Sequence, residues 1–281
     1  MVTPETQKEF CMASEAKSLT ATPLRLRILP VLSITVFLAL WQICVAPEGV
    51  EDWRIPNTLL TAPWDVLQLL IDKFTNPQPD GATLLAHAWT SMQEAFLGYI
   101  LALAVGLPLG LAMGWFNTVR GYARPIFEMI RPIPPVAWIP LTIFWFGIGL
   151  SGKVFIIWIS GIVPCVINAF IGVRMSNPVY IQMSRTYGAT DWQIFRTICI
   201  PSALPMVFGA LQIALAYCWV TLVAAELLAS DQGLGYLISM GRMLGRTDIV
   251  LVGMVSVGIS GSIISFIIEK VEARLLAGIR R

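Results

Sequence analysis

Six long runs without a charged residue constrain the fold of this chain more than any other feature. A helix needs about 20 apolar residues to cross about 30 Å of hydrocarbon, and each run is long enough to do so. The runs cover residues 28–47, 95–119, 132–152, 154–173, 197–225 and 249–268. We therefore expect an all-α, polytopic membrane protein with six transmembrane helices, the fifth of which begins near residue 201.

The composition supports a membrane protein and excludes several other classes. Hydrophobic residues make up 56% of the chain and charged residues 13%, whereas charged residues make up about 25% of a typical soluble domain. The net charge of +2 does not indicate binding to nucleic acid. Five scattered cysteines without a CxxC pair favour neither a disulfide framework nor a zinc site. The single histidine, His87, argues against a histidine-based metal or catalytic centre, and we expect it at a surface or interface.

The distribution of Lys and Arg predicts the orientation of the helices. Cytoplasmic loops of membrane proteins carry an excess of these residues. With a cytoplasmic N-terminus, 14 of the 19 basic residues fall inside and 5 outside. The inside residues are Lys8, Lys17, Arg25, Arg27, Arg120, Arg124, Arg131, Arg174, Arg185, Arg196, Lys270, Arg274, Arg280 and Arg281. We expect both termini in the cytoplasm, a cytoplasmic tail over 1–27 and a transmembrane domain over 28–281. A cleaved signal peptide is the alternative for the first run.

Two outer segments differ from simple connectors. Residues 61–74 place apolar side chains at helical spacing, which predicts an amphipathic helix at the outer leaflet. Residues 226–248 are too polar to span the bilayer and too apolar for a free loop. We expect this second segment to be partly re-entrant, with its backbone covered by protein or water.

The second span repeats small residues every four positions, which predicts close helix packing. The alternative is that glycine is simply common in membrane helices. The repeat consists of Gly98, Ala102, Gly106, Gly110 and Gly114. Four prolines between Arg131 and Pro140 stand at the entry of the third span, and such a segment cannot begin as a regular helix.

Residues 174–197 form a long inside loop with specified helix ends. Asn177 and Pro178 are suited to begin one short helix, and Gly188 is suited to end it in the left-handed conformation. Thr190 and Gln193 have the spacing of a capping box and begin a second short helix. Two short helices that meet at a glycine are suited to receive a partner.

Four motifs in one order carry a resemblance to a known family. The segment from Gln182 to Pro205 resembles the EAA loop of binding-protein-dependent ABC importer permeases. The other three motifs resemble the branch that serves nitrate, sulfonates, taurine and bicarbonate. They are the segments 131–142, 145–149 and 224–237. In this chain Gln182, Met183 and Ser184 stand where the family has Glu-Ala-Ala.

This resemblance implies a type I, MetI-like permease fold, an inner-membrane location and a set of partners. The partners are a second copy of the chain, a cytoplasmic ABC ATPase dimer, a periplasmic or lipid-anchored solute-binding protein and membrane lipid. The chain itself would carry no cofactor, because ATP and magnesium would bind to the ATPase. The residues implied in ATPase docking are Gln182, Met183, Ser184, Arg185, Gly188, Ala189 and Asp191, with Trp192 and Phe195 as supports.

Polar residues within or beside spans are candidates for the transport pathway. Asn168 and Gln212 either line the pathway or form hydrogen bonds between helices. Glu226 ends the fifth span and is either a proton relay or, as we favour, a structural gate. Gly106, Gly110 and Gly114 are the candidates for helix packing.

Residues 147–154 nearly match the phosphate-binding pattern GxxxxGK[ST]. Val154, however, replaces the hydroxyl residue that would hold magnesium, so we expect no nucleotide site there.

We conclude from the sequence that the chain is the permease subunit of an ATP-driven importer of a small anion and is not an enzyme. The rival functions are an ion-coupled secondary transporter and an integral membrane enzyme. A coupled carrier is expected to show intramembrane ionisable residues and an internal repeat. An enzyme would need a cluster of catalytic side chains, which the sequence does not indicate.

Overall fold

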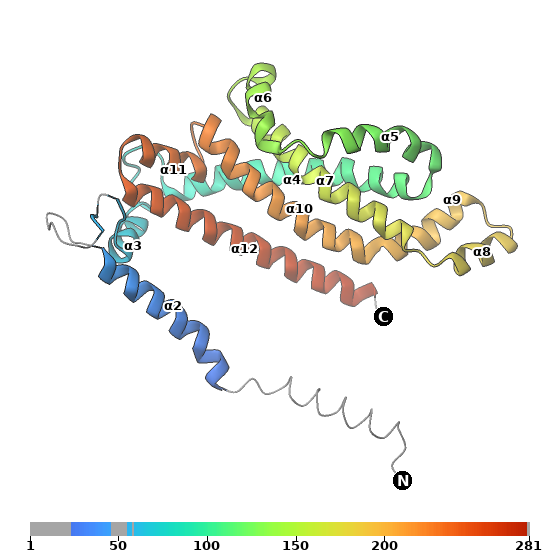
Figure 1. The fold of residues 1–281 in the computed structure, drawn as a ribbon, viewed down its shortest axis with the longest axis horizontal. Helices are drawn as coiled ribbons and strands as arrows, with labels where there is room; N and C mark the ends of the chain where they lie inside the picture. Colours follow the sequence, from blue (N-terminus) through green and yellow to red (C-terminus); the bar gives the residue numbers. More distant parts are fainter. Residues whose placement is uncertain (1–23, 46–54, 58, 280–281) are drawn as a thin grey trace, which may run out of the picture. The chain divides into compact units, whose positions relative to one another are not determined.

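The structure is a computed structural model that describes residues 24–45, 55–57 and 59–279 (Figure 1). The chain divides into two compact units, residues 1–67 and 68–281. The boundary between the units lies within helix α3 (Pro63–Asp72). Most of the expected tail 1–27 lies outside the described residues.

The first unit contains helix α2 (Leu24–Cys44) and the beginning of α3. The Trp64 amide donates to the side-chain oxygen of Gln42 at 3.3 Å, which ties the start of α3 to α2. The expected amphipathic helix over 61–74 is confirmed by α3, whose first turn carries Asp65 at the end where an acid is favourable.

The second unit consists of helices joined by short connections. In chain order they are α4 (Leu84–Trp115), α5 (Asn117–Ile130), the 3₁₀ turn η1 (Pro135–Trp138), α6 (Ile139–Phe146), α7 (Leu150–Arg174), α8 (Pro178–Thr186), α9 (Asp191–Ile194), the π-helical turn η2 (Phe195–Cys199), α10 (Ile200–Ala229), α11 (Leu234–Met243) and α12 (Thr247–Ile279). The α8–α9 pair lies at one end of the bundle and α11 at the other (Figure 1). We call these the α8 end and the α11 end.

In the described residues four continuous helical stretches are long and apolar enough to span a bilayer. They are Leu84–Trp115, Leu150–Arg174, Asp191–Ala229 and Thr247–Lys270. A fifth span results if α5 and the segment Pro135–Phe146, which are bent by 85°, cross together. The apolar part of α2, Leu29–Cys44, is shorter than these spans. The all-helical membrane fold is therefore confirmed, whereas the number six remains an expectation.

The helix boundaries differ from the expected spans in three places. The fifth span, expected from about residue 201, belongs to one helical stretch that already begins at Asp191. Helix α4 begins at Leu84 instead of residue 95, so it includes polar residues that the hydropathy pattern assigns to an outer loop. The expected span 132–152 is not one helix, because the chain turns at residues 131–134 and again at Gly147 and Gly149, both at positive φ. The proline-rich segment therefore joins α5 to the helical segment Pro135–Phe146, and the two form one bent span if they cross together.

Helix α7 lies between α4 and α10, and small residues allow all three to approach closely. A Cβ atom added to Gly110 would lie 2.5 Å from the carbonyl oxygen of Val166 on α7. Added Cβ atoms at Gly98, Gly106 and Gly114 would also collide with α7 side chains. The expected packing role of this stripe agrees with the geometry, and the partner of the stripe is α7. On the other side of α7, Gly161 packs against Cys218 of α10.

Candidate functional site

The caps of the 174–197 loop have the expected geometry. The side chain of Asn177 accepts a hydrogen bond from the Val179 amide at 2.9 Å, with Pro178 at the first position of α8. Thr190 and Gln193 form a reciprocal capping box at the start of α9. Local side-chain chemistry therefore defines where each short helix begins.

Gly188 ends α8 at a φ of 81°, as expected. The amide of Gly188 donates to the carbonyl of Arg185, and the amide of Ala189 donates to the carbonyl of Ser184, both at 3.0 Å. This pair of bonds is the Schellman arrangement, which satisfies the last carbonyls of a helix. The Arg185 guanidinium also donates to the Asp191 carboxylate at 3.1 Å, so it joins α8 to α9 across the glycine.

An aromatic cluster attaches this loop to the bundle. The ring of Phe195, which is buried, lies 6.4 Å from Trp115, 5.4 Å from Phe116 and 5.6 Å from Trp192 between ring centroids. Trp115 and Phe116 stand at the end of α4, and Ile194 beside Phe195 is fully buried. A displacement of α9 would therefore move the end of α4.

The opposite face of the loop is exposed. Tyr187 is 87% exposed, and Gln182 and Met183 are also exposed. A shallow groove of about 430 Å³ separates α8 from the start of α10. Its lining residues are Tyr180, Met183, Ser184, Tyr187, Thr197, Ile198, Pro201 and Ser202. Of the predicted docking residues, Met183 and Ser184 line this groove, whereas Ala189 packs against the buried cluster that contains Ile194 and Phe195.

At the α11 end, three remote side chains cap the first turn of α11. The amides of Gly233, Leu234 and Gly235 donate to His87 Nδ1 at 3.1 Å, Ser91 Oγ at 2.8 Å and Glu226 Oε2 at 2.7 Å. Glu226 is 1% exposed and accepts a further bond from Ser91 at 2.5 Å. The first amides of a helix otherwise lack partners, and a carboxylate there is favoured by the helix dipole.

Glycines are necessary at this contact. A Cβ atom on Gly233, whose φ is 133°, would collide with the Glu226 carboxylate. One on Gly235 would lie 2.8 Å from the carbonyl oxygen of Val223. Helix α11 thus packs on α10 and α12, and its first amides are satisfied by protein groups, as the predicted re-entrant segment would require.

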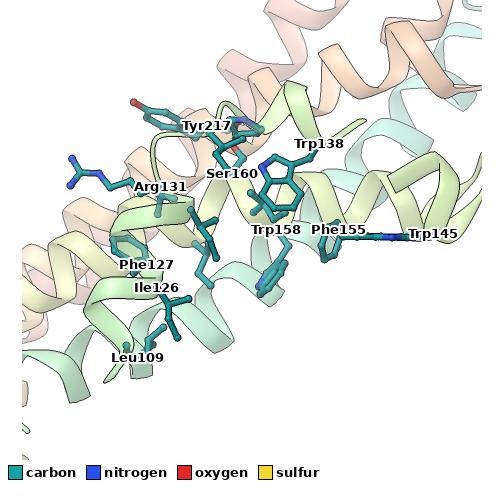
Figure 2. A pocket seen from close by; sticks show the side chains of 17 residues that line it. Leu109, Ile126, Phe127, Arg131, Trp138, Trp145, Phe155, Trp158, Ser160 and Tyr217 are labelled. Atoms are coloured by element: carbon teal, nitrogen blue, oxygen red, sulfur yellow. Dashed lines mark hydrogen bonds between the residues drawn. The ribbon is translucent and has the colours of Figure 1, made fainter. Parts of the chain in front are cut away.

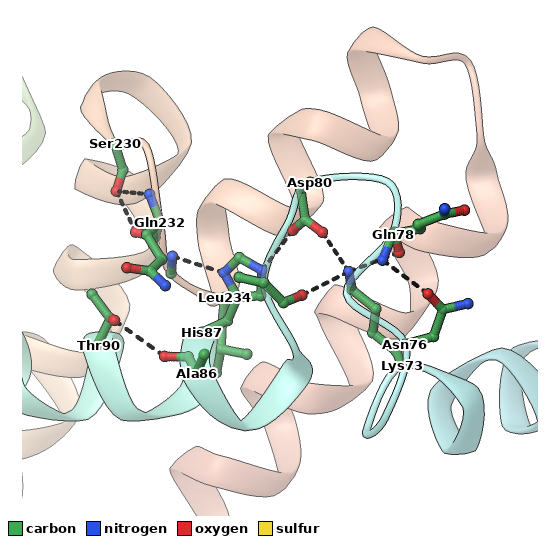
Figure 3. Close-up of polar contacts among 12 residues, drawn as sticks. Lys73, Asn76, Gln78, Asp80, Ala86, His87, Thr90, Ser230, Gln232 and Leu234 are labelled. Carbon is green, nitrogen blue, oxygen red and sulfur yellow. Dashed lines mark hydrogen bonds and ion pairs between the residues drawn. The ribbon is translucent and has the colours of Figure 1, made fainter.

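His87 is not at the surface, because it is 1% exposed, and it lies where α4 contacts the turn before α11. Its Nδ1 accepts the Gly233 amide, so in the neutral ring the proton is on Nε2, 2.5 Å from Asp80 Oδ2. Asp80 also pairs with Lys73, whose ammonium donates to the carbonyls of Gln78 and Ala82 at 2.9 Å (Figure 3). No local sequence pattern indicated these contacts, because Asp80 lies in a turn and Gly233 is 146 residues from His87 in the chain.

A second buried ion pair contains the lysine of the near-match to a phosphate-binding pattern. Lys153, which is 4% exposed, pairs with Glu94 of α4 and donates to Ser230 Oγ at 3.0 Å. The lysine that a nucleotide would need is therefore already engaged by protein groups. Among the described residues, no group of three His, Cys, Asp or Glu side chains is placed to hold a metal ion.

The pathway candidates do not lie together. The side-chain amide of Asn168 donates to the Pro164 carbonyl at 2.8 Å within α7, whereas Gln212 is exposed on α10. Neither residue lines the aromatic pocket of about 430 Å³ that lies beside α5, η1, α7 and α10 (Figure 2). Trp138 and Trp158 line this pocket, and Arg131 lies at its edge. The sequence pattern predicted Arg131 in an inside loop and did not predict its place at the edge of this pocket.

Comparisons with known proteins agree with the four motifs. Residues 102–277 match the family described as "Binding-protein-dependent transport system inner membrane component". The taurine transport system permease protein TauC of Escherichia coli is 33% identical over 246 residues, which cover 86% of each chain. The nitrate import permease protein NrtB of Leptolyngbya laminosa is 26% identical over 92% of this chain and 91% of its own.

A solved structure has a similar fold. One chain of the MetNI methionine ABC transporter in an inward-facing conformation aligns with a TM-score of 0.58. The alignment covers 70% of this chain and 96% of that chain, with 21% identity. The chain therefore belongs to the binding-protein-dependent transport system inner membrane component family, as a non-catalytic ABC permease of the branch that includes the taurine and nitrate permeases.

Proposed function

We propose that this permease forms the pathway of an ATP-driven importer that carries a small anion of the taurine, sulfonate, nitrate or bicarbonate type. Two copies surround the pathway, a periplasmic or lipid-anchored solute-binding protein delivers the anion, and both termini face the cytoplasm. ATP and magnesium bind to a separate ATPase. The similarity to TauC and NrtB supports the anion class.

One observation carries the proposal. The exposed surface of α8 belongs to the α8–α9 pair, whose shape is fixed by local contacts and which is attached to the bundle. Its caps, the Gly188 turn and the Arg185–Asp191 contact define its shape. The Phe195 cluster connects it to α4. A protein that binds this surface and changes its own shape on binding ATP would therefore move the spans, which is the requirement for coupling.

The test is reconstitution of the permease in proteoliposomes with the ATPase and the solute-binding protein encoded beside it. We expect uptake of one or more labelled anions from taurine, nitrate and bicarbonate that requires ATP and the binding protein. Uptake that follows an imposed ion gradient without ATP would instead support a secondary transporter and contradict the proposal. Crosslinking of the purified complex measures the number of permease copies, for which we expect two.

A further inference from the structure

Helix α5 carries a row of charged side chains along one face. Arg120, Arg124, Glu128 and Arg131 are separated by four, four and three residues, a spacing that places them on the same side of a helix. The side chains of Arg124, Glu128 and Arg131 are 59%, 49% and 48% exposed. A different face of α5 carries Ala123, Ile126, Phe127 and Ile130, which line the aromatic pocket.

Helix α5 runs alongside the long helices, so its charged row lies between the α8 end and the α11 end of the bundle (Figure 1). Helix α5 packs against α4 and lines one pocket together with Leu109 of α4 and Val163 of α7. With 14 residues, it extends about 21 Å back along the spans from Asn117 at the α8 end. Together with the segment Pro135–Phe146 it has the length and hydropathy of one bent span.

Arg131 stands at the bend of this span, close to the middle of the bundle. It lines the same pocket as Ser160 of α7 and Tyr217 of α10. Ser160 is about 15 Å from the start of α7 and about 21 Å from its end, at 1.5 Å per residue. In Figure 2 the Arg131 guanidinium and the Tyr217 hydroxyl point toward the same side.

A charged row at this depth is costly against lipid and is expected to face water or protein. Discontinuous helices in transporters often mark the place where substrate passes. Glu128 lies 3.6 Å from Arg124 and 3.7 Å from Arg131, so one acid is shared between two guanidinium groups. The four side chains of the row carry a net charge of +2, so the row is suited to attract an anion.

Building on the function proposed above, we propose that Arg131, with the Tyr217 hydroxyl, binds the anionic group of the substrate midway along the pathway. The ligand class is a singly charged oxyanion, because a guanidinium presents paired N–H donors that match two oxygen atoms of such a group. Arg124 and Arg120 continue the positive side of the pathway toward the α8 end. Anion passage then depends on a protein cation as well as on the solute-binding protein.

The experiment measures ATP-dependent uptake of labelled nitrate, bicarbonate or methanesulfonate, whichever the wild type carries, by the complete transporter in proteoliposomes, with the loaded binding protein varied up to saturation. We expect Arg131→Gln to lower the maximal rate about tenfold, which corresponds to about 1.4 kcal/mol. The concentration of binding protein that gives half-maximal uptake should not change, because docking takes place outside. Arg131→Lys should transport at a rate between those of the wild type and Arg131→Gln, because lysine keeps the charge but not the paired N–H donors, and Arg131→Glu should be slower than Arg131→Gln.

Arg274→Gln, which removes an exposed charge near the end of α12, is the matched control and should transport as the wild type does. An equal rate for Arg131→Gln and wild type would overturn the proposal, as would equal losses for Gln and Lys. If Arg131→Gln does not assemble, Tyr217→Phe provides the test. We expect its maximal uptake rate to fall about threefold, and an unchanged rate would contradict the proposal.

Two further measurements complete the test. The first separates an anion site from lipid binding, and the second separates failure of the anion site from failure of the proposed function. An effect of Arg131→Gln that occurs in vesicles with phosphatidylglycerol and vanishes in pure phosphatidylcholine would assign the row to lipid binding and overturn the proposal. If the wild type takes up none of the labelled anions with ATP, the proposed function itself fails. If the wild type is active and the Arg131 variants transport equally well, the proposed function is supported and only the anion site is refuted.

Discussion

The hydroxyl of Ser91 on α4 donates a 2.5 Å hydrogen bond to the carboxylate of Glu226 on α10, although 135 residues separate them in the chain. Both side chains also accept amides from the first turn of α11. Through this contact α4, α10 and α11 meet at one buried point. The predicted role of Glu226 as a gate would act through the position of α11.

We expect Glu226→Ala to loosen α11, because the Gly235 amide and the Ser91 hydroxyl would lose a buried partner. Each unsatisfied group costs about 1–3 kcal/mol. The measurements are the thermal midpoint of the purified protein and the rate of proteolysis between α10 and α11. Glu269→Ala, which removes an exposed acid on α12, is the control. Identical results for the two variants would show that the cap does not stabilise the protein.

Asp80→Ala should destabilise the protein more than the loss of an exposed acid does. It would leave the Lys73 ammonium, 3% exposed, without its carboxylate, and breaking a buried pair costs about 3–5 kcal/mol. The additional change Lys73→Met should restore part of the stability, because it removes the uncompensated charge. Asp231→Ala is the control outside this ion pair. Unfolding in denaturant measures each variant, and an absence of rescue by Lys73→Met would contradict the role of the ion pair.

Two glycine-to-alanine changes test the packing of α4 on α7. In Gly110→Ala the new Cβ would meet the Val166 carbonyl at 2.5 Å, and we expect a loss of about 1–3 kcal/mol in stability. Nothing lies within 4 Å of a Cβ added to Gly209 in α10. Gly209→Ala should therefore be neutral or stabilising by up to about 1 kcal/mol. The same thermal midpoint for both variants would refute the packing role of the small-residue stripe.

Gly188→Val should weaken ATPase attachment without removing the permease from the membrane. The backbone φ of 81° strains a β-branched residue by roughly 1–2 kcal/mol, whereas open space surrounds an added Cβ. Gly188→Asn should be milder, because Asn tolerates the left-handed region. Co-purification of the ATPase and uptake in proteoliposomes measure the effect. Wild-type values for Gly188→Val would contradict the assignment of the α8–α9 element to coupling.

The proposed orientation predicts which exposed positions a membrane-impermeant thiol reagent can reach in intact cells. In a chain with Cys11 and Cys44 replaced by serine, Gln78→Cys should be labelled from outside. Tyr187→Cys, at a position that is 87% exposed, should be labelled only after the cells are opened. The reverse pattern would place the termini outside and refute the orientation drawn from the basic residues.

The sequence by itself determined the elements that depend on neighbouring residues. The starts of α8 and α9 were predicted correctly because a cap joins a side chain to a backbone amide two or three residues away. The small-residue stripe of α4 was visible because helical spacing alone brings its members to one face. Four motifs in order also identified the family, and residues 102–277 match it.

Tertiary structure decided the contacts between distant segments. His87, Ser91 and Glu226 meet at the first turn of α11 because α4 and α10 pack on the same side of that helix, and no local pattern specifies such a meeting. The prolines after Arg131 indicated irregular backbone, but hydropathy placed this residue in a loop. The packing of α5 against α4 places Arg131 at the same pocket as Ser160 and Tyr217, because a charged helix can pack on a bundle when one of its faces is apolar.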